Sequence, residues 1–329
     1  MSVLTEQDQA LIELRQADKL LLTTHENPDG DALGSLVAMH WILEQLGKDS
    51  LMFMSPDEFP LPWEYRGFTF DGLVGAPPED VVERTIVFLD CGNIDRMPVE
   101  FLQADGLHIL NIDHHHDNTR FGTVNLVAPE ASCTAEIVWR LAKDLGAEIT
   151  LAIADALYTG LVTDTGKFMY ENTTPEAHRM AAELIEVGVE PHEVYRRLYE
   201  ELPFRRLKLL QRALESVERH DDGALTIAHL TREDYEATGA FETDSEGVVD
   251  HMRSVEGTRV AGLVRELLGD ERDGMRKVSL RATDNTVDVS RIARAFGGGG
   301  HPQAAGFSTA TPYRELVDML RALVAEQLP

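Results

Sequence analysis

Four short stretches of this chain place acids or histidines directly behind a hydrophobic run. They are His25-Glu26-Asn27-Pro28-Asp29-Gly30-Asp31, Asp90, Asp113-His114-His115-His116 and Asp164. A buried cluster of carboxylates repels itself and shifts its own pKa values unless cations lie among the oxygens. The residue types therefore indicate a hydrolase that uses metal ions to activate water.

Six of these side chains are candidate metal ligands. They are His25, Asp29, Asp31, Asp90, His114 and Asp164. Six protein ligands are too many for one catalytic ion with an open position, whereas two ions ~3.5–4 Å apart would use them, with one carboxylate bridging. Imidazole and carboxylate donors without thiolate favour Mn²⁺, with Mg²⁺, Fe²⁺, Co²⁺ and Zn²⁺ as alternatives. We predict two divalent ions, with manganese as the first choice.

The elements that must position these residues follow from the hydrophobic pattern. Runs over 20–24, 85–89 and 108–112 are typical of buried strands, and each ends just before ionisable residues. Helical patterns cover 31–46, 134–145 and 151–161, and the last delivers Asp164 in a turn. Strands alternating with helices predict an α/β fold with a mostly parallel sheet flanked by helices. Ligands gather beyond the carboxyl ends of such strands, so the acids should converge.

The pattern divides the 329 residues into two domains joined by a helical linker. We expect a metal-binding catalytic domain over 1–190 and a linker over 191–217, with two amphipathic helices separated at Pro203. A smaller α/β domain over 218–329 should contain strands over 224–230 and 276–282 and a helix near 247–255. Ser132-Cys133-Thr134 is predicted to cap the helix that follows it, and no base is evident that would make Cys133 a nucleophile.

A glycine run near the chain end, Gly297 to Gly300, is followed by His301. Glycines let backbone N–H groups approach an anion closely, and His301 adds a donor. We predict a phosphate- or nucleotide-binding loop, and a flexible linker is the alternative. Arg253 and Arg281 are candidate phosphate partners because a guanidinium can bind two oxygens at once, although both could serve only solubility.

The net charge of −27 argues against electrostatic capture of long nucleic acid. Residues 251–300 nevertheless carry nine basic against seven acidic side chains, so a local cationic wall and a small anionic substrate are expected. No apolar run approaches the ~20 residues of a membrane span, and no signal-peptide pattern opens the chain. With only Cys91 and Cys133, the chain fits a reducing cytoplasm, and we expect no association with membranes.

Three of these stretches resemble the signature motifs of the DHH phosphoesterase superfamily. They are His25 to Ser35, Asp90 and Asp113-His114-His115. The stretch from Gly297 to Phe307 is similar to the C-terminal substrate domain associated with that superfamily, so the similarity spans nearly the whole chain. Order and spacing resemble the compact branch that includes nanoRNases, pAp phosphatases and cyclic-dinucleotide phosphodiesterases. Short oligoribonucleotides, pAp, and cyclic di-AMP or its linear product are the substrates this implies.

The resemblance also implies a role for each motif residue. His25, Asp29 and Asp90 would hold one ion, and the second would be held by Asp31, Asp90, His114 and Asp164. Asp113 would orient a histidine, and His115 would face the phosphate and assist the leaving oxygen. A water or hydroxide between the ions would attack phosphorus in line. With the loop and arginines named above, the predicted substrate contacts are His115, Arg96, Arg253, Arg281, Gly299, Gly300 and His301. Arg96 lies in a loop that resembles the second motif of the family, and it orients either the site or only that loop.

Two other interpretations stay open. A manganese inorganic pyrophosphatase shares the N-terminal motifs but lacks a loop like 297–301. A non-catalytic nucleotide sensor would have lost one or more metal ligands, and every expected ligand is present here. The order of substrate preference, the physiological metal and the oligomeric state are not fixed by the sequence, and a homodimer is expected.

Overall fold

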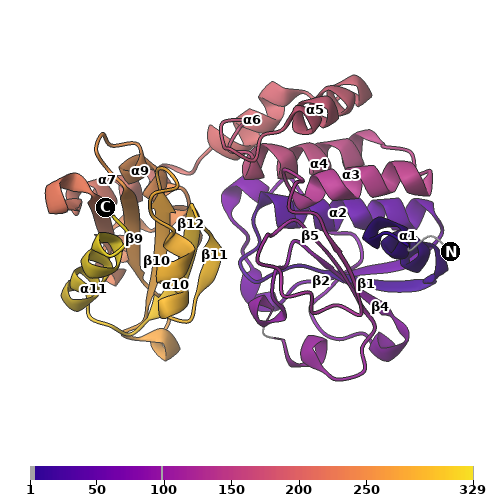
Figure 1. The fold of residues 1–329 in the computed structure, drawn as a ribbon, viewed down its shortest axis with the longest axis horizontal. Coiled ribbons are helices and arrows are strands. Elements are labelled where there is room, and N and C mark those ends of the chain that lie inside the picture. Colours follow the sequence, from indigo (N-terminus) through magenta and orange to yellow (C-terminus); the bar gives the residue numbers. More distant parts are fainter. Residues whose placement is uncertain (1–3, 98, 329) are drawn as a thin grey trace. The chain divides into compact units, whose positions relative to one another are not determined.

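The computed structural model describes residues 4–97 and 99–328 and divides into two compact units, Met1–Glu200 and Glu201–Pro329. Each unit has its own sheet and helices (Figure 1). The predicted α/β fold with two domains is confirmed. No helix in the described ranges is both long and apolar enough to cross a membrane.

The first unit is built on a six-stranded sheet in the order β3-β2-β1-β4-β5-β6, and every pairing in it is parallel. The strands are β1 (Lys19–Thr23), β2 (Asp49–Phe53), β3 (Leu73–Val74), β4 (Thr85–Leu89), β5 (Ile109–Asp113) and β6 (Val124–Val127). The three strands expected from the sequence correspond to β1, β4 and β5, which are neighbours. Their carboxyl ends therefore lie at one edge of the sheet.

Six helices belong to the described residues of this unit. They are α1 (Glu6–Gln16), α2 (Gly30–Gln45), α3 (Thr134–Leu145), α4 (Leu151–Asp164), α5 (Pro175–Val187) and α6 (Pro191–Tyr199). Helices α2 and α3 pack on the sheet, and α4 lies against both (Figure 1). Short 3₁₀ segments, among them Ile94–Arg96 and Glu100–Gln103, lie in the loops, and Met97 and Leu102 cover strands β1, β2, β4 and β5 from the other side.

The close approach of α2 and α4 depends on glycine. A Cβ at Gly34 would lie 2.4 Å from the carbonyl oxygen of Ala156, so a larger residue would force the helices apart. Helix α4 also runs further than predicted. Its hydrogen bonding continues to Thr165, whose N–H donates to Leu161, so Asp164 ends a helix and does not lie in a turn.

The second unit contains a mixed sheet in the order β11-β12-β10-β9-β8-β7, with only the β8–β9 pairing parallel. Its strands are β7 (Glu218–His220), β8 (Leu225–Leu230), β9 (Val260–Glu266), β10 (Arg276–Ala282), β11 (Gly299–His301) and β12 (Ala304–Thr309). Its helices are α7 (Phe204–Glu215), α8 (Arg232–Thr238), α9 (Val248–Arg253), α10 (Val289–Ala295) and α11 (Tyr313–Ala325).

Both faces of this sheet carry a hydrophobic core. Val278, Leu280 and Phe307 pack with α10 and α11 on one face. Helices α7, α8 and α9 cover β8 and β9 on the other, around Tyr235 and Met252. The two units are divided between α6 and α7, so the segment expected as a linker over 191–217 is shared between them.

The predicted glycine-rich loop is in part an edge strand. Gly299 and His301 belong to β11, which pairs with β12 through Gly299–Gly306 and His301–Ala304. A Cβ at Gly298 would lie 2.2 Å from the carbonyl oxygen of Gly306, and Gly300 has φ 131°. Packing against β12 therefore requires these glycines whether or not an anion binds.

Candidate metal centre

The carboxyl ends of β1, β4 and β5 bring the sequence motifs together. The chain leaving β1 carries His25 and enters α2 at Asp29, the loop after β4 opens with Asp90, and β5 ends at Asp113. Asp164 reaches the same edge from the end of α4, where its carboxylate lies near His114. Parallel strands thus convert four distant stretches into one cluster.

The first group of donor atoms comprises those of His25, Asp29 and Asp90, which all lie within 4.8 Å of one another. His25 Nδ1 is 2.7 Å from the carbonyl oxygen of Glu26, so this nitrogen donates and Nε2 is the ring nitrogen that faces the cluster. Nε2 lies 3.7 Å from Asp90 Oδ2. Asp29 caps α2 by accepting from the N–H groups of Asp31 and Ala32 through Oδ1 alone.

The second group comprises donor atoms of Asp31, His114 and Asp164, again within 4.8 Å of one another. His114 Nε2 lies 3.7 Å from Asp164 Oδ2 and 3.6 Å from Asp90 Oδ1. Asp90 therefore presents one oxygen to each group. Its backbone has φ 58°, in the left-handed region, and its side chain is 3% exposed.

The electrostatics of the cluster fit cations. Burial and the nearby carboxylates of Asp90 and Asp164 raise the pKa of Asp31 well above its usual value. Burial raises the pKa of Asp164 to about 7. Burial alone would lower the pKa of His114, but Asp164 and Asp90 outweigh it and raise the pKa to about 9. The clustered carboxylates thus favour a bound positive charge, which either a proton or a metal ion supplies.

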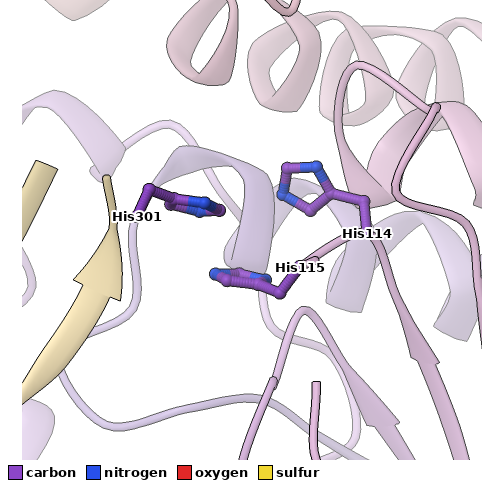
Figure 2. A group of neighbouring side chains, drawn as sticks. All are labelled: His114, His115 and His301. Atoms are coloured by element: carbon purple, nitrogen blue, oxygen red, sulfur yellow. The ribbon is translucent and has the colours of Figure 1, made fainter. Parts of the chain in front are cut away.

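Asp113 is buried beside the cluster and holds the loop that carries His114 and His115. Its Oδ1 accepts from His115 Nδ1 at 2.7 Å and from the His114 N–H at 2.9 Å. Asn118 donates to its Oδ2 at 2.5 Å. Figure 2 shows the rings of His114 and His115, whose centroids are 5.0 Å apart and whose planes are at 70° to each other. The ring of His301, also drawn there, belongs to β11 of the second unit.

The residues that hold the candidate ligands in place lie outside the sequence motifs. Thr134 Oγ1 donates to Asp90 Oδ1 at 3.0 Å, and the N–H groups of Thr134 and Ala135 donate to the two Asp31 oxygens at 2.7 and 2.9 Å. Cys133 takes the N-cap position of α3, as the tripeptide predicts, but its side chain makes no capping hydrogen bond, and Asp31 accepts from the first N–H groups of the helix instead. Asn172 donates to Asp164 at 3.1 Å. Only the Ser132-Cys133-Thr134 signal marked this helix start in the sequence.

The remaining candidate residues lie in three places. The carbonyl of Arg96 accepts from the Glu26 N–H at 2.7 Å and so ties the loop after β4 to the loop after β1. In the second unit, Arg281 and His301 both pair with Ala304 of β12. Arg253 lies on α9, and its guanidinium is 3.5 Å from Asp250, which is 3.9 Å from that of Arg281.

Comparison with known proteins connects this centre to a family. The N-terminal domain of the DHH family matches residues 19–161, and the DHHA1 domain matches residues 230–328. The bifunctional oligoribonuclease and PAP phosphatase NrnA of Thermus thermophilus is 38% identical over 291 residues, which span 87% of this chain and 83% of that protein. NrnA of Bacillus subtilis is 26% identical over 88% of this chain and 89% of its own length.

Solved structures show the same architecture. An exopolyphosphatase-related protein from Bacteroides fragilis superposes with a TM-score of 0.83 at 26% identity, covering 98% of this chain and 96% of that one. RecJ of Thermus thermophilus in complex with Mn²⁺ gives a TM-score of 0.59 at 16% identity, over 99% of this chain and 55% of RecJ, and shares the fold.

The fold and the cluster define a two-domain α/β hydrolase with an acid–histidine centre. The chain belongs to the DHH family of phosphoesterases. The resemblance drawn from His25 to Asp31, Asp90 and Asp113 to His115 is confirmed.

Proposed function

We propose that this chain is a metal-dependent phosphoesterase that hydrolyses short oligoribonucleotides and pAp with two divalent ions. One observation carries this proposal: two groups of imidazole and carboxylate donors meet at Asp90. Relatives named bifunctional oligoribonuclease and PAP phosphatase support the substrate class. Linear dinucleotides and cyclic di-AMP are further candidate substrates of the same centre.

For the first ion we propose His25, Asp29 and Asp90 as ligands. For the second we propose Asp31, Asp90, His114 and Asp164. Mn²⁺ is our first choice, supported by the donor types and by the Mn²⁺ in the related RecJ structure, with Mg²⁺, Fe²⁺, Co²⁺ and Zn²⁺ as alternatives. When bound, the ions would neutralise phosphate charge and lower the pKa of a water toward neutrality.

His115 is the residue that we propose to assist the leaving oxygen. Its Nδ1 is held by Asp113, which leaves Nε2 to donate. Burial alone would lower the pKa of His115, but the adjacent Asp113 carboxylate raises it, which favours the protonated ring that a general acid requires. Asp113 acts through this histidine and through the loop that it anchors.

We propose that the second unit recognises the nucleotide. Arg281 and His301 flank Ala304 across three strands and so project from the same face of the sheet. Arg253, Gly299 and Gly300 complete the proposed contacts there. Arg96 is proposed as a separate substrate contact within the first unit. The small residues between the cations would let a phosphate approach the backbone.

Hydrolysis of pAp, pApA and cyclic di-AMP with Mn²⁺ and with chelator, followed by chromatography, tests the proposal. We expect turnover that requires Mn²⁺ on pAp and pApA. Asp90→Asn should fold normally and lose activity, because it removes the carboxylate charge shared by the two donor groups. Faster turnover of inorganic pyrophosphate than of any nucleotide would favour the pyrophosphatase interpretation, and nucleotide binding without turnover would favour a sensor.

We also propose that the enzyme works in a reducing compartment, the cytoplasm. Cys91 and Cys133 are both free and buried, and burial raises the pKa of each thiol. Buried free thiols of this kind contribute to packing, and the fold does not depend on their oxidation to a disulfide.

A further inference from the structure

One face of the second sheet carries a strip of basic and small residues. The side chains of Val278, Leu280 and Phe307 enter the core beneath α10 and α11. Their neighbours along each strand point to the opposite face, because successive side chains of a strand alternate. In register, Lys277 lies between Arg265 and Ser308, and Ser279 lies beside Gly306. The next row holds Arg281 and Ala304.

Arg265 is the buried anchor of this strip. Its side chain is 5% exposed, and its guanidinium donates to Ser245 at 2.7 Å and to Ser279 at 2.9 Å. Its ion-pair partner is Glu246, at 3.0 Å. Its Nε has no hydrogen-bond partner among the described residues. A buried guanidinium needs such partners because desolvation of an unpaired charge is costly.

Glu246 reaches the same strip from the segment before α9 and remains 46% exposed. Lys277 neighbours Arg265 in the β9–β10 register, so Glu246 faces two cations at once. Removal from water would raise the pKa of Glu246, but Arg265, Lys277 and Arg281 lower it to about 2. The carboxylate is therefore ionised throughout the physiological range.

The strip keeps an excess of positive charge in a strongly acidic chain. Four cations, Arg253, Arg265, Lys277 and Arg281, face the carboxylates of Glu246 and Asp250. A third carboxylate, Glu242, also acts on Arg265 but is paired with Arg272. The whole chain has a net charge of −27. An exposed carboxylate among these cations lies where an anionic ligand would otherwise find its partners.

We propose that Glu246 is a specificity-determining residue, an internal counter-ion that competes with the phosphate of a nucleotide for the cations of this strip. The identity of the ligand as a nucleotide rests on the proposed function. Glu246 lowers the affinity for each phosphate and leaves contacts to an uncharged nucleoside unchanged. The strip thereby binds short, singly phosphorylated products weakly enough to release them.

Glu246→Gln tests this, because the amide keeps the size and the hydrogen-bond acceptor while removing the charge. Calorimetry on the full-length, metal-loaded protein would measure its affinity for AMP and for adenosine at low and at high salt. We expect Glu246→Gln to bind AMP about three- to tenfold tighter than the wild type does. This is the effect expected from removing one unit charge at a half-exposed position. The gain should shrink at high salt, and adenosine affinity should not change.

Asp273→Asn is the matched control. Asp273 is 81% exposed and lies 3.5 Å from Arg232, so this variant removes the same charge from the same unit away from the strip. It should leave AMP affinity unchanged. Glu246→Asp, which keeps the charge, should stay close to wild type in AMP affinity even if its melting temperature falls.

Equal or weaker AMP binding by Glu246→Gln overturns the proposal, and weaker binding would mean that Glu246 serves only to hold Arg265. A gain of the same size for adenosine would also overturn it, since that ligand has no phosphate. These measurements need no turnover. Failure to hydrolyse any of the substrates would therefore contradict the proposed function. The comparison of AMP and adenosine affinities would still test the role of Glu246.

Discussion

At the scale of single residues, the centre depends on Asp90. Its two oxygens face His25 and His114, and its backbone is held at φ 58° by the turn after β4. A residue other than glycine in this region stores strain, and it persists only where surrounding structure imposes it. The left-handed backbone of Asp90 therefore lowers stability, and the same conformation directs its carboxylate between the two donor groups.

Replacing Asp90 by glycine and by alanine separates these effects. Both variants should lose more than about a hundredfold in kcat/KM, because even residues behind a ligand cost ~10–100-fold. Asp90→Gly should be more stable than Asp90→Ala by about 1 kcal/mol in urea unfolding, since glycine adopts positive φ without strain. Equal stability of the two variants would contradict strain at this position.

The pKa values of His114 and Asp164 predict how metal binding depends on pH. The pKa of His114 is raised to about 9, so the metal-free protein holds this proton at neutral pH and must release it to bind a cation. Mn²⁺ affinity should therefore fall about tenfold per pH unit below pH 9. It should fall more steeply below the pKa of Asp164, about 7.

Calorimetric titration with Mn²⁺ from pH 6 to 9, in buffers of different ionisation enthalpy, would count the released protons. His114→Ala should bind Mn²⁺ more weakly and should remove the step between pH 7 and 9. An affinity that does not change with pH would refute the coupling between protons and metal at this centre.

At the scale of elements, the start of α3 organises the candidate ligands. Its first N–H groups bind Asp31, and the Thr134 hydroxyl binds Asp90, so one helix end orients two carboxylates that come from α2 and from the loop after β4. The positive end of the helix dipole also favours negative charge there. Helix α4 passes close by at Gly160, where a Cβ would lie 2.9 Å from Asp31 Oδ1.

Thr134→Val keeps the shape of the side chain and removes the donor to Asp90. We expect Mn²⁺ affinity to fall about tenfold, as for other residues that orient ligands, with a loss of stability of about 1 kcal/mol. Thr238→Val is the control, because Thr238 donates to Asp234 within α8 of the second unit. Loss of Mn²⁺ affinity in the control alone, or in neither variant, would count against this role.

Gly160→Ala should displace Asp31 by steric contact. Overpacking of this kind costs roughly 1–3 kcal/mol, and Mn²⁺ affinity should fall with it. Gly146→Ala is the control, because it should lower stability by a similar amount without displacing a neighbour. Gly146 ends α3 in the left-handed conformation, which alanine adopts only with strain, and the space around it is open. If both variants bind Mn²⁺ equally well, the contact between α4 and Asp31 is unimportant.

At the scale of the whole molecule, the two units have separate cores and separate proposed tasks. Every donor of the two candidate metal groups lies in Met1–Glu200, whereas the basic strip lies in Glu201–Pro329. A unit with its own hydrophobic core is expected to fold alone. The division of the chain therefore predicts a division of ligand binding.

Expression of residues 1–200 and 201–329 as separate fragments tests this division. The first fragment should bind two Mn²⁺ ions, as counted by metal analysis, and the second should bind AMP without Mn²⁺. Circular dichroism would establish that each fragment folds. Stoichiometric Mn²⁺ binding by the second fragment would contradict the assignment of all ligands to the first.

The sequence by itself determined the strands, the helices and the residues at the sheet edge. Continuous apolar runs before His25, Asp90 and Asp113 specify buried parallel strands, and local periodicity is enough to predict them. The change of pattern along the chain also indicated two domains, in agreement with the family resemblance. Side chains that follow neighbouring parallel strands lie at one edge of the sheet, so their convergence could be expected from the sequence alone.

Only the tertiary structure decided which groups hold the candidate ligands and which face the basic strip occupies. Thr134 and Asp31 are far apart in the chain, as are Glu246 and Lys277, and no local pattern pairs them. The glycine run became an edge strand because β12 was available to pair with it. Hydrogen bonds and charges act over short distances in space regardless of separation in sequence, so these partners exist only once the chain has folded.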